Sequence, residues 1–436
     1  MSRELQFHIA DKETFKQNLL ALTQEFEPFC LLDSCGFYTY ERMRLPLPYY
    51  HQYEVLAGLG AYQTLWPNNN NNFENLKAFA DQREWKFGCL SYDLKNETES
   101  LDSQNHDDIE APQMLFFIPR IVVSLQGNKG RVIGPNEGQA QYIKDRLLTE
   151  DPDPSPFQPR DSLNQLKPRI TREAYTQKVS NLIEHIANGD IYEVNFCREN
   201  YAENADINPW LVFSKIRREA PAPFAAFMRS GEHYVMSASM ERFLKHQNGK
   251  LISQPIKGTI GRGRDWREDR EMKSLLKNDP KERAENVMIV DLVRNDLNKN
   301  SIPGTVQVEE LFGIYPFPQV HQMISTISGK LKPGASPLQA LKDAFPMGSM
   351  TGAPKLKAME LIEHYEETKR GIFSGSIGYI DPDGNFDFNV IIRTILFNEH
   401  KKHLSLQVGS AITFDADPVK EWEECELKIS KLSQFV

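Results

Sequence analysis

A two-residue turn, Asn248-Gly249, most constrains how this chain of 436 residues folds. It stands between two runs rich in β-branched and aromatic residues, 234–244 and 251–256. An Asn-Gly pair readily adopts the positive φ angles of a tight turn, so the two runs are predicted to form an antiparallel hairpin. In an ideal hairpin around this turn, residues whose numbers sum to 497 face each other. The turn therefore predicts the strand register of this region.

The C-terminal part of the chain carries further strand patterns. Residues 376–380, 386–397 and 404–414 are separated by polar turn segments, as in an antiparallel meander. A helix is predicted from Thr171, a suitable N-cap, to Gly189, because apolar residues recur there at helical spacing. This half of the chain is therefore predicted to combine sheets with interposed helices.

A proline-rich segment divides the chain. Residues 151–168 contain five prolines and few apolar residues, which favours an extended linker or a surface crossover over a helix or central strand. We expect an N-terminal region at 1–150 and a second region at 169–436. Strands of the first region are expected to join the core of the second, so that the segment is a crossover.

Composition indicates a globular protein with a small-molecule ligand. The chain is 40% hydrophobic and 25% charged, and its net charge of -9 leaves no basic surface for nucleic acid. Five scattered cysteines without a C-x-x-C pair argue against disulfides and structural zinc. No signal peptide is evident, and the longest uncharged run, 311–329, contains two prolines and would span a membrane badly. A cytoplasmic protein without membrane segments is expected.

Lys257 occupies an unusual place in the predicted hairpin. Strand alternation places three isoleucines on one face and Lys257 with Thr259 on the other, a polar face of the sheet. Gly258 between them would let a ligand approach the backbone. An edge-strand lysine that prevents aggregation is the alternative interpretation, and these residues by themselves favour it.

Six motifs that follow one another between about residues 170 and 432 resemble the chorismate-utilising enzymes. They are Gly189-Asp-Ile-Tyr-Glu193-Val-Asn195, Ser239-Met-Glu241-Arg-Phe243, Pro255-Ile-Lys257-Gly-Thr259, Ala284-Glu285 with the apolar helix after it, Thr351-Gly-Ala-Pro-Lys355, and Glu421-Trp-Glu-Glu424-Cys-Glu-Leu-Lys428. The family includes the large subunits of anthranilate and aminodeoxychorismate synthases, and the isochorismate and salicylate synthases. The resemblance implies an α+β fold in which two large, mainly antiparallel sheets pack together with helices on the outside.

Lys257 distinguishes the branches of this family. Anthranilate enzymes usually carry alanine at this position, whereas aminodeoxychorismate enzymes carry a lysine that attacks the chorismate ring. A lysine amine is a nucleophile only when deprotonated. The resemblance thus implies amination of chorismate to 4-amino-4-deoxychorismate, a folate precursor. An anthranilate synthase large subunit and a non-catalytic amino-acid-binding regulator are the alternatives.

The resemblance makes Glu241 the general acid that protonates the departing C4 hydroxyl. In the ideal hairpin register, however, Glu241 faces Ile256 and Lys257 faces Met240, so the two side chains would point to opposite faces. A shared role requires a bulge or a break in the ladder. We predict this break near Pro255, which cannot donate a hydrogen bond.

The resemblance also implies a magnesium site. Asp417-Pro418 predicts the start of a helix, and Glu421, Glu424 and Lys428 then share one helical face. Magnesium keeps several waters and needs few protein ligands, so Glu285 and Glu424 with a substrate carboxylate would suffice. A solvated charged face is the alternative for the C-terminal helix.

Chorismate is a dicarboxylate, and the resemblance supplies candidates that would meet it. Arg393 lies in an apolar strand where its charge needs a partner, either the substrate carboxylate or a structural ion pair. His321 matches a family histidine near the ring, assigned here as a third catalytic residue, although a lone histidine is often a core residue. The other predicted contacts are Gly258, Thr259, Tyr379, Gly409, Ala411 and Lys428.

Position 193 departs from the family pattern. Isochorismate and salicylate synthases carry a lysine there that activates water, and aminodeoxychorismate enzymes usually carry glutamine, whereas this chain has Glu193. We hypothesise that Glu193 positions ammonia or ammonium. No glutaminase motif is present in the chain, so ammonia is expected from a separate glutamine amidotransferase small subunit.

A tryptophan site is a further implication of the resemblance. Leu31-Leu-Asp-Ser34 resembles a segment that holds tryptophan in related large subunits, and Pro221-Ala-Pro223-Phe matches the second half of that site. Ser34, Pro221 and Pro223 are therefore candidate tryptophan contacts. Ordinary strand and turn structure is the alternative.

Overall fold

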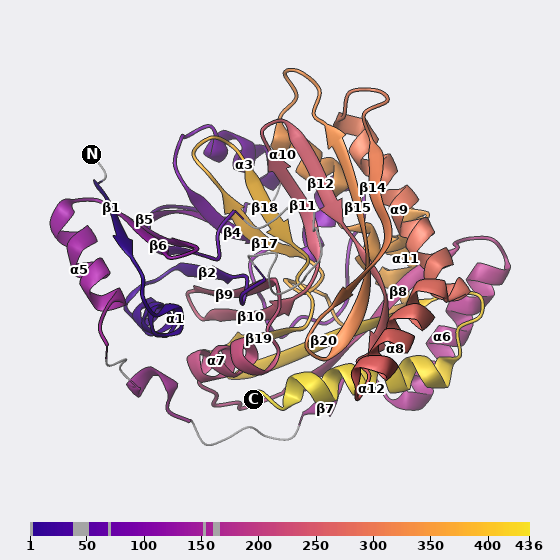
Figure 1. Cartoon of the computed structure of the whole chain (residues 1–436). Coiled ribbons are helices and arrows are strands. Elements are labelled where there is room, and N and C mark those ends of the chain that lie inside the picture. The colour runs from indigo at the N-terminus through magenta and orange to yellow at the C-terminus, as the bar shows by residue number, and fades with distance from the viewer. Residues whose placement is uncertain (1–2, 38–51, 69–70, 151–153, 160–165) are drawn as a thin grey trace.

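Figure 1 shows the computed structural model of the chain, which describes residues 3–37, 52–68, 71–150, 154–159 and 166–436. The middle of the proline-rich segment thus lies partly outside the described residues. No helix in the described ranges is both long enough and apolar enough to cross a bilayer.

The helices are α1 (Lys12–Leu22), α3 (Asn72–Ala80), α4 (Lys95–Thr98), α5 (Glu137–Leu147), α6 (Arg172–Ala187), α7 (Pro209–Glu219), α8 (Trp266–Asn278), α9 (Pro280–Asn300), α10 (Pro337–Ala344), α11 (Lys355–Tyr365) and α12 (Pro418–Ser433). Short 3₁₀ turns are η1 (Thr23–Glu25), η2 (Tyr92–Leu94), η3 (Ser155–Phe157) and η4 (Gly348–Met350).

The strands are β1 (Arg3–His8), β2 (Phe29–Asp33), β3 (Val55–Leu65), β4 (Lys86–Leu90), β5 (Met114–Gln126), β6 (Lys129–Gly134), β7 (Lys167–Pro168), β8 (Glu193–Ala202), β9 (Phe224–Ser230), β10 (His233–Ser239), β11 (Arg242–Gln247), β12 (Lys250–Gln254), β13 (Ile256–Gly261), β14 (Gln307–Pro316), β15 (Val320–Lys330), β16 (Gly352–Ala353), β17 (Ser376–Ile380), β18 (Phe386–Asn389), β19 (Thr394–Asn398) and β20 (His403–Ile412).

The strands of the described residues form one continuous antiparallel hydrogen-bonded network with two arms, and the packing of two large sheets against each other stays a prediction. One arm runs from β15 through β12, β11, β18, β17 and β4 to β5, and the other runs from β5 through β3, β2, β9, β10, β19 and β20 to β8. The joint is β5, because this strand of 13 residues is long enough to pair with both β3 and β4. The predicted α+β class with a large antiparallel sheet is confirmed.

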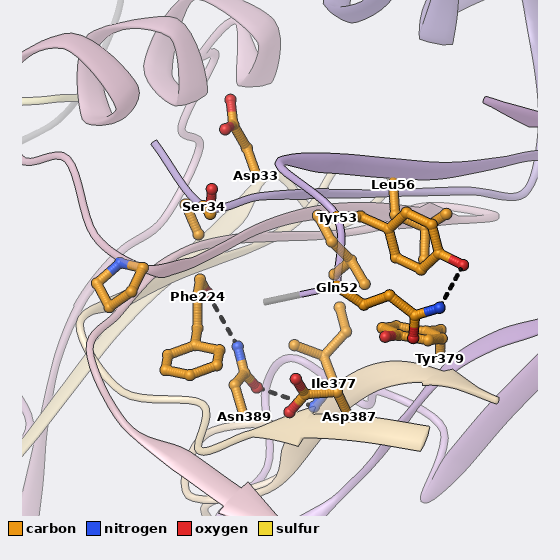
Figure 2. A pocket seen from close by; sticks show the side chains of 13 residues that line it. Asp33, Ser34, Gln52, Tyr53, Leu56, Phe224, Ile377, Tyr379, Asp387 and Asn389 are labelled. Carbon is orange, nitrogen blue, oxygen red and sulfur yellow. Dashed lines mark hydrogen bonds between the residues drawn. The ribbon is translucent and has the colours of Figure 1, made fainter. Parts of the chain in front are cut away.

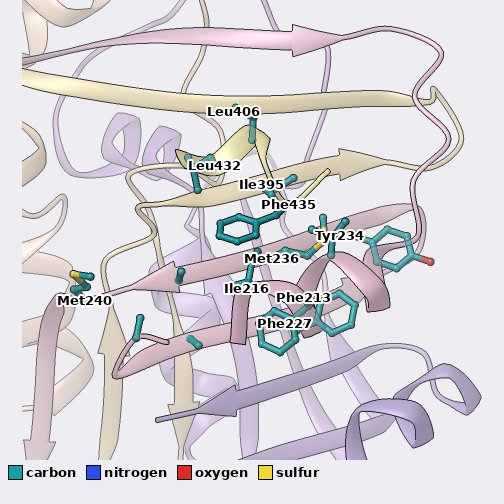
Figure 3. Packing of buried hydrophobic residues seen from close by; sticks show 14 of the residues in the cluster. Phe213, Ile216, Phe227, Tyr234, Met236, Met240, Ile395, Leu406, Leu432 and Phe435 are labelled. Carbon is teal, nitrogen blue, oxygen red and sulfur yellow. The ribbon is translucent and has the colours of Figure 1, made fainter. Parts of the chain in front are cut away.

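Strands of the N-terminal region pair directly with strands of the later region. β2 pairs with β9 and β4 pairs with β17, so residues on both sides of the proline-rich segment share a ladder. Two large hydrophobic clusters draw on both regions. Figure 3 shows part of one, in which Phe435 and Leu432 from the end of the chain pack near Met236 of β10 and Ile216 of α7.

The predicted hairpin forms and then breaks where it was expected to. His246 faces Leu251 and Gln247 faces Lys250, in the register that the turn predicts. The ladder then shifts between Arg242 and Lys245, β12 ends at Gln254, and β13 begins after Pro255. The predicted break near Pro255 is confirmed.

Two runs predicted as single strands are each split in two. Residues 234–244 form β10 and β11 with Glu241 between them, and residues 386–397 form β18 and β19 with 390–393 between them. The two interruptions bond to each other, because the amide of Val390 donates to the carbonyl of Glu241 at 3.0 Å. At the two breaks, the side chains of Glu241 and Arg393 no longer follow the alternation between the two faces of a strand.

Candidate active site

Lys257 and Glu193 form an ion pair inside the protein. Lys257 lies on β13 and its Nζ donates a hydrogen bond to Oε1 of Glu193, the first residue of β8. The two side chains are buried, with 9% and 1% of their surface exposed. Burial lowers the pKa of Lys257, but the charges of Glu193, Glu285 and Glu241 outweigh it and raise the pKa above its ordinary value. The lysine is therefore an ammonium group in the free protein.

Glu241 lies in the gap between β10 and β11, within electrostatic reach of Lys257. Its Oε1 accepts a hydrogen bond from the hydroxyl of Ser349, at 2.5 Å. Burial raises the pKa of Glu241 to about 7, against the opposing influence of Ser349 and Lys257. A carboxyl group with this pKa carries its proton over much of the neutral range, as a general acid must.

Carboxyl groups of α9 and α12 gather beside this pair. Burial raises the pKa of Glu285 to about 7, and the charges of Glu193 and Glu282 add to the effect. Burial also raises the pKa of Glu282 and of Glu421, and Glu424 raises both further. The two helices therefore present mutually repelling carboxylates, which a divalent cation would relieve.

This arrangement fits a magnesium ion that keeps most of its water. Among the described residues, no three histidine, cysteine, aspartate or glutamate side chains are close enough together to ligate one metal. Magnesium is commonly held by one or two carboxylates, so the residues present are compatible with the predicted ligands Glu285 and Glu424. Glu424 now pairs with Lys428 at 2.6 Å, and half of its side chain is exposed and accessible to a cation.

Arg393 carries a positive charge that no carboxylate of the described residues pairs with. It has a positive φ of 50° in the gap between β18 and β19, and its carbonyl accepts a hydrogen bond from Ala238 at 3.1 Å. Burial lowers the pKa of Arg393, and no carboxylate in the described part of the chain pairs with it. An arginine in this situation is well suited to bind a carboxylate ligand.

The predicted backbone contacts lie on strands near these groups. Gly258 has a φ of 94°, and a side chain at this position would meet Glu282. Thr259 donates from its hydroxyl to Gln322 at 2.9 Å, and Lys428 donates to the carbonyl of Gly409 at 2.7 Å. Ala411, on the same strand as Gly409, faces Asn195 of β8, two residues from Glu193. Gly258 and Gly409 thus border the carboxylate cluster through Glu282 and Lys428.

His321 makes a different set of contacts. Its Nε2 lies 3.0 Å from Oδ1 of Asp269 on α8, and Asp269 also accepts hydrogen bonds from Arg262. His321 is buried and its Nδ1 has no partner among the described residues. The contacts of His321 thus involve α8, and its catalytic role stays a prediction.

A cavity that none of Lys257, Glu193 and Glu241 lines, called the second cavity below, contains some of the residues predicted for tryptophan. Ser34 lines it, as Figure 2 shows, and so does Pro223, whereas Pro221 is not among its lining residues. Asp33 turns away from it and pairs with Lys16 at 3.1 Å and Arg217 at 3.0 Å.

Tyr379, predicted as a chorismate contact, lies in this second cavity. Its ring packs against Tyr53 and Trp85, with centroids 6.0 Å and 5.9 Å away. The residues next to a tyrosine in the sequence do not show how far its side chain lies from a site formed by distant parts of the chain. Within the described residues, the ring contacts of Tyr379 and the lining of its cavity include none of Lys257, Glu193 and Glu241, and its role as a chorismate contact stays a prediction.

Sequence reasoning missed two residues of the site. Glu282 precedes the predicted metal ligand Glu285 by three residues on the same helix, so helical periodicity is a signal that could have found it. Ser349 lies in the short turn η4 and reaches Glu241 from a segment 108 positions away. No local pattern indicates such a contact.

Comparison with known proteins shows the family of the chain. Residues 43–434 match the profile of the chorismate binding enzyme family. The chain therefore belongs to the chorismate binding enzymes. Aminodeoxychorismate synthase component 1 of Klebsiella aerogenes is 35% identical over 348 residues, covering 79% of this chain and 75% of that protein. Anthranilate synthase component 1 of Thermus thermophilus is 33% identical over 358 residues, covering 80% and 76%.

Another relative is longer than this chain. Aminodeoxychorismate synthase of Streptomyces griseus is 36% identical over 363 residues, which cover 80% of this chain and 49% of that protein. The chain thus spans about half the length of that relative.

Two solved structures share the fold. Anthranilate synthase component I of Streptococcus pneumoniae superposes with a TM-score of 0.76 at 24% identity, covering 86% of this chain and 91% of that one. The menaquinone-specific isochorismate synthase of Escherichia coli gives a TM-score of 0.75 at 18% identity, covering 100% and 94%. The large α+β fold is therefore that of the chorismate-utilising enzymes.

Proposed function

We propose that this chain is the large subunit of an aminodeoxychorismate synthase, which converts chorismate and ammonia to 4-amino-4-deoxychorismate. The observation that carries the proposal is the buried Lys257 beside the proton-carrying Glu241. A primary amine and a carboxylic acid at one site can attack a ring carbon and protonate a leaving hydroxyl in the same step. The relatives named for this activity support the choice.

Each residue of the site has its own role in the proposed reaction. Lys257, once deprotonated, attacks the chorismate ring, the ring double bonds shift, and the C4 hydroxyl leaves as water with the proton of Glu241. Ammonia then attacks C4 and releases Lys257. Arg393 would bind a substrate carboxylate, and the backbone at Gly258 and Thr259 would support the same ligand.

A magnesium ion would complete the substrate site by neutralising a chorismate carboxylate. Glu285 and Glu424 would hold it, with Glu282 and Glu421 beside them. Ammonia is proposed to come from a separate glutamine amidotransferase subunit in the cytoplasm, because the site has groups for amination but no described group for glutamine hydrolysis.

An anthranilate synthase large subunit is the second candidate, since the Thermus thermophilus relative is nearly as similar to this chain as the aminodeoxychorismate synthases are. The amine of Lys257 favours the first function, because amination at C4 uses a nucleophile that the other reaction does not need. A non-catalytic regulator would have no use for the proton-carrying Glu241.

A second proposal concerns the cavity of Ser34, Pro223 and Tyr379, which we propose binds an aromatic amino acid, tryptophan. Three aromatic rings, including Tyr53 and Phe224, line the cavity and suit an aromatic side chain. Residues from both 1–150 and 169–436 line it, so the two regions would bind this ligand jointly.

One incubation tests these functions. The chain is mixed with chorismate, magnesium and ammonium, and the product is identified by mass and fluorescence. The expected product is 4-amino-4-deoxychorismate. Anthranilate would contradict the proposal in favour of the second candidate, and tryptophan binding without turnover would favour a regulator.

A further inference from the structure

Only one of the two carboxylate oxygens of Glu193 takes part in its ion pair with Lys257. Oε1 accepts the hydrogen bond from Lys257, whereas Oε2 is buried and has no hydrogen-bond partner among the described residues. Leaving a buried carboxylate oxygen without a partner costs free energy. Such an oxygen is suited to receive a proton, because protonation would lower that cost.

The ion pair poses a chemical problem for the proposed function. Lys257 must lose a proton before its nitrogen can attack, yet the charged groups that face it in the described part of the chain hold the proton in place. These groups are Glu193 on β8, Glu241 between β10 and β11, and Glu282 and Glu285 on α9. A base within hydrogen-bond reach is therefore required.

Glu193 is the acidic side chain in that position. Glu241 already bonds to Ser349 and needs its own proton for the leaving hydroxyl. Glu285 lies 3.9 Å from Lys281, faces the cluster of α9 and α12, and would be neutralised by a cation rather than by a proton. Glu193 is the carboxylate that receives a hydrogen bond from Lys257 itself.

We propose that Glu193 is the base of the reaction, taking a proton from the Lys257 ammonium so that the free amine can attack chorismate. This inference rests on the proposed function and assigns Glu193 a role at the nucleophile in place of a role at ammonia. The pair first becomes neutral, as Glu193 carboxylic acid and Lys257 amine. The nitrogen lone pair then forms the bond to the ring, and the C4–O bond breaks as Glu241 gives up its proton and water departs.

The proton returns when the second half of the reaction is complete. Ammonia forms the C4–N bond, the bond between the ring and Lys257 breaks, and its electron pair returns to the lysine nitrogen. The new C4 ammonium gives one proton to the Glu241 carboxylate, and Glu193 returns its proton to Lys257. The sum is chorismate and ammonia giving 4-amino-4-deoxychorismate and water, with both carboxyl groups restored.

The test compares Glu193→Gln with the parent protein between pH 6.5 and pH 9. At pH 7 the variant is expected to lose about 100-fold in kcat with ammonium, while the KM for chorismate changes less than about threefold. The deficit should shrink as pH rises, because Lys257 then loses its proton to water. The ratio of variant to parent rates is measured, since Glu241 titrates in both. Glu184→Gln, an exposed carboxylate on α6, is the matched control and should match the parent.

Two results would overturn the proposal: a deficit that does not change with pH, or a variant that is faster than the parent at pH 7. Glu193→Asp retains a base and is expected to keep the pH profile of the parent at a lower rate. If it instead follows the pH profile of Glu193→Gln, the charge of Glu193 is not what the reaction uses.

A measurement without turnover separates this inference from the proposed function. Cyanate carbamylates free amines, so the pH at which Lys257 reacts can be followed by peptide mass spectrometry. In Glu193→Gln this midpoint should fall by at least about one pH unit, because a neighbouring negative charge is lost. An unchanged midpoint contradicts the proton transfer, whereas failure of the parent to aminate chorismate contradicts the proposed function.

Discussion

Arg242 and Asp387 form a buried bidentate ion pair. Nε of Arg242 donates to Oδ1 of Asp387 at 2.8 Å, and Nη2 donates to Oδ2 at 2.9 Å. Arg242 directly follows Glu241, and Asp387 lines the second cavity. The guanidinium also lies over the ring of Phe224, another residue of that cavity, at 5.0 Å. The backbone at Glu241 is therefore connected to the wall of the second cavity through Arg242 and its ion pair with Asp387.

Substituting Asp387 by asparagine should destabilise the protein by about 3–5 kcal/mol, because the Arg242 charge would stay buried without its partner. Urea unfolding measures the change. Asp383→Asn, on the exposed turn before the same strand, should stay within about 0.5 kcal/mol of the parent. Equal stabilities of the two variants would show that the pair contributes little.

Removal of the Lys257 amine should abolish amination. Lys257→Met retains a side chain of similar length, yet it should reduce formation of 4-amino-4-deoxychorismate by about three orders of magnitude or more, since the nucleophile is gone. Product is quantified by mass spectrometry. Lys250→Met, on the neighbouring strand β12, breaks a partly exposed pair with Glu309 at 2.7 Å and should keep most of the activity. Undiminished amination by Lys257→Met would refute a covalent role.

The activity should fall as pH rises through about 7. Glu241 has a pKa raised to about 7 by burial, and it can protonate the leaving hydroxyl only below that value. A plot of kcat against pH should show this basic limb in the parent, and Glu241→Gln should be inactive at every pH. A flat profile between pH 6 and pH 9 would exclude Glu241 as the acid.

The same buried acid should weaken the fold at alkaline pH. Its pKa is 4.5 in an unfolded chain and about 7 in the native protein, so the native state binds more protons between these values and stability falls as pH rises through them. The loss is about 3 kcal/mol and is complete above pH 7. Denaturant unfolding at pH 5 and pH 8 should show the parent losing stability relative to Glu241→Gln by about this amount.

Magnesium should bind more weakly below neutral pH. Burial raises the pKa of Glu285 to about 7, so protons compete with the cation for this ligand. The dissociation constant, measured by titration calorimetry, should rise about tenfold for each pH unit below that value. Glu285→Gln should bind magnesium poorly at every pH. Binding that is equally tight at pH 5.5 and pH 8 would place the metal elsewhere.

L-Tryptophan should raise the thermal midpoint of the parent protein, because a ligand that binds only the native state stabilises it. Ser34→Trp places a large ring at the cavity wall and should reduce this shift. L-Alanine is the matched ligand without a ring. Equal shifts with both amino acids would show that the cavity does not select aromatic side chains.

Prediction of the site from the sequence was most successful where the site requires a departure from the regular register of the hairpin. The hairpin register required Lys257 and Glu241 to point apart, and this conflict led to the prediction of a break near Pro255 that the structure confirms. The register of a hairpin is set by its turn, so this prediction needed only adjacent residues.

Long-range geometry limited the rest of the predictions. The run 386–397 has continuous β propensity, but the hydrogen bond between Val390 and Glu241 interrupts it and turns Arg393 out of the strand. Tyr379 lines the second cavity, which its place in a motif does not indicate, and its contact with chorismate stays a prediction. The ion pair between Lys257 and Glu193 joins residues 64 positions apart, and no pattern of either strand indicates it.

The length of β5 has a practical consequence for anyone who would divide this protein. Since that strand belongs to the first 150 residues and connects both arms of the network, cutting the chain in the proline-rich segment would leave β4 and β17, and β2 and β9, as exposed edges in separate fragments. Unpaired edges of this kind favour aggregation. A folded protein is therefore expected when the two pieces are produced together, and not when they are purified separately and then mixed.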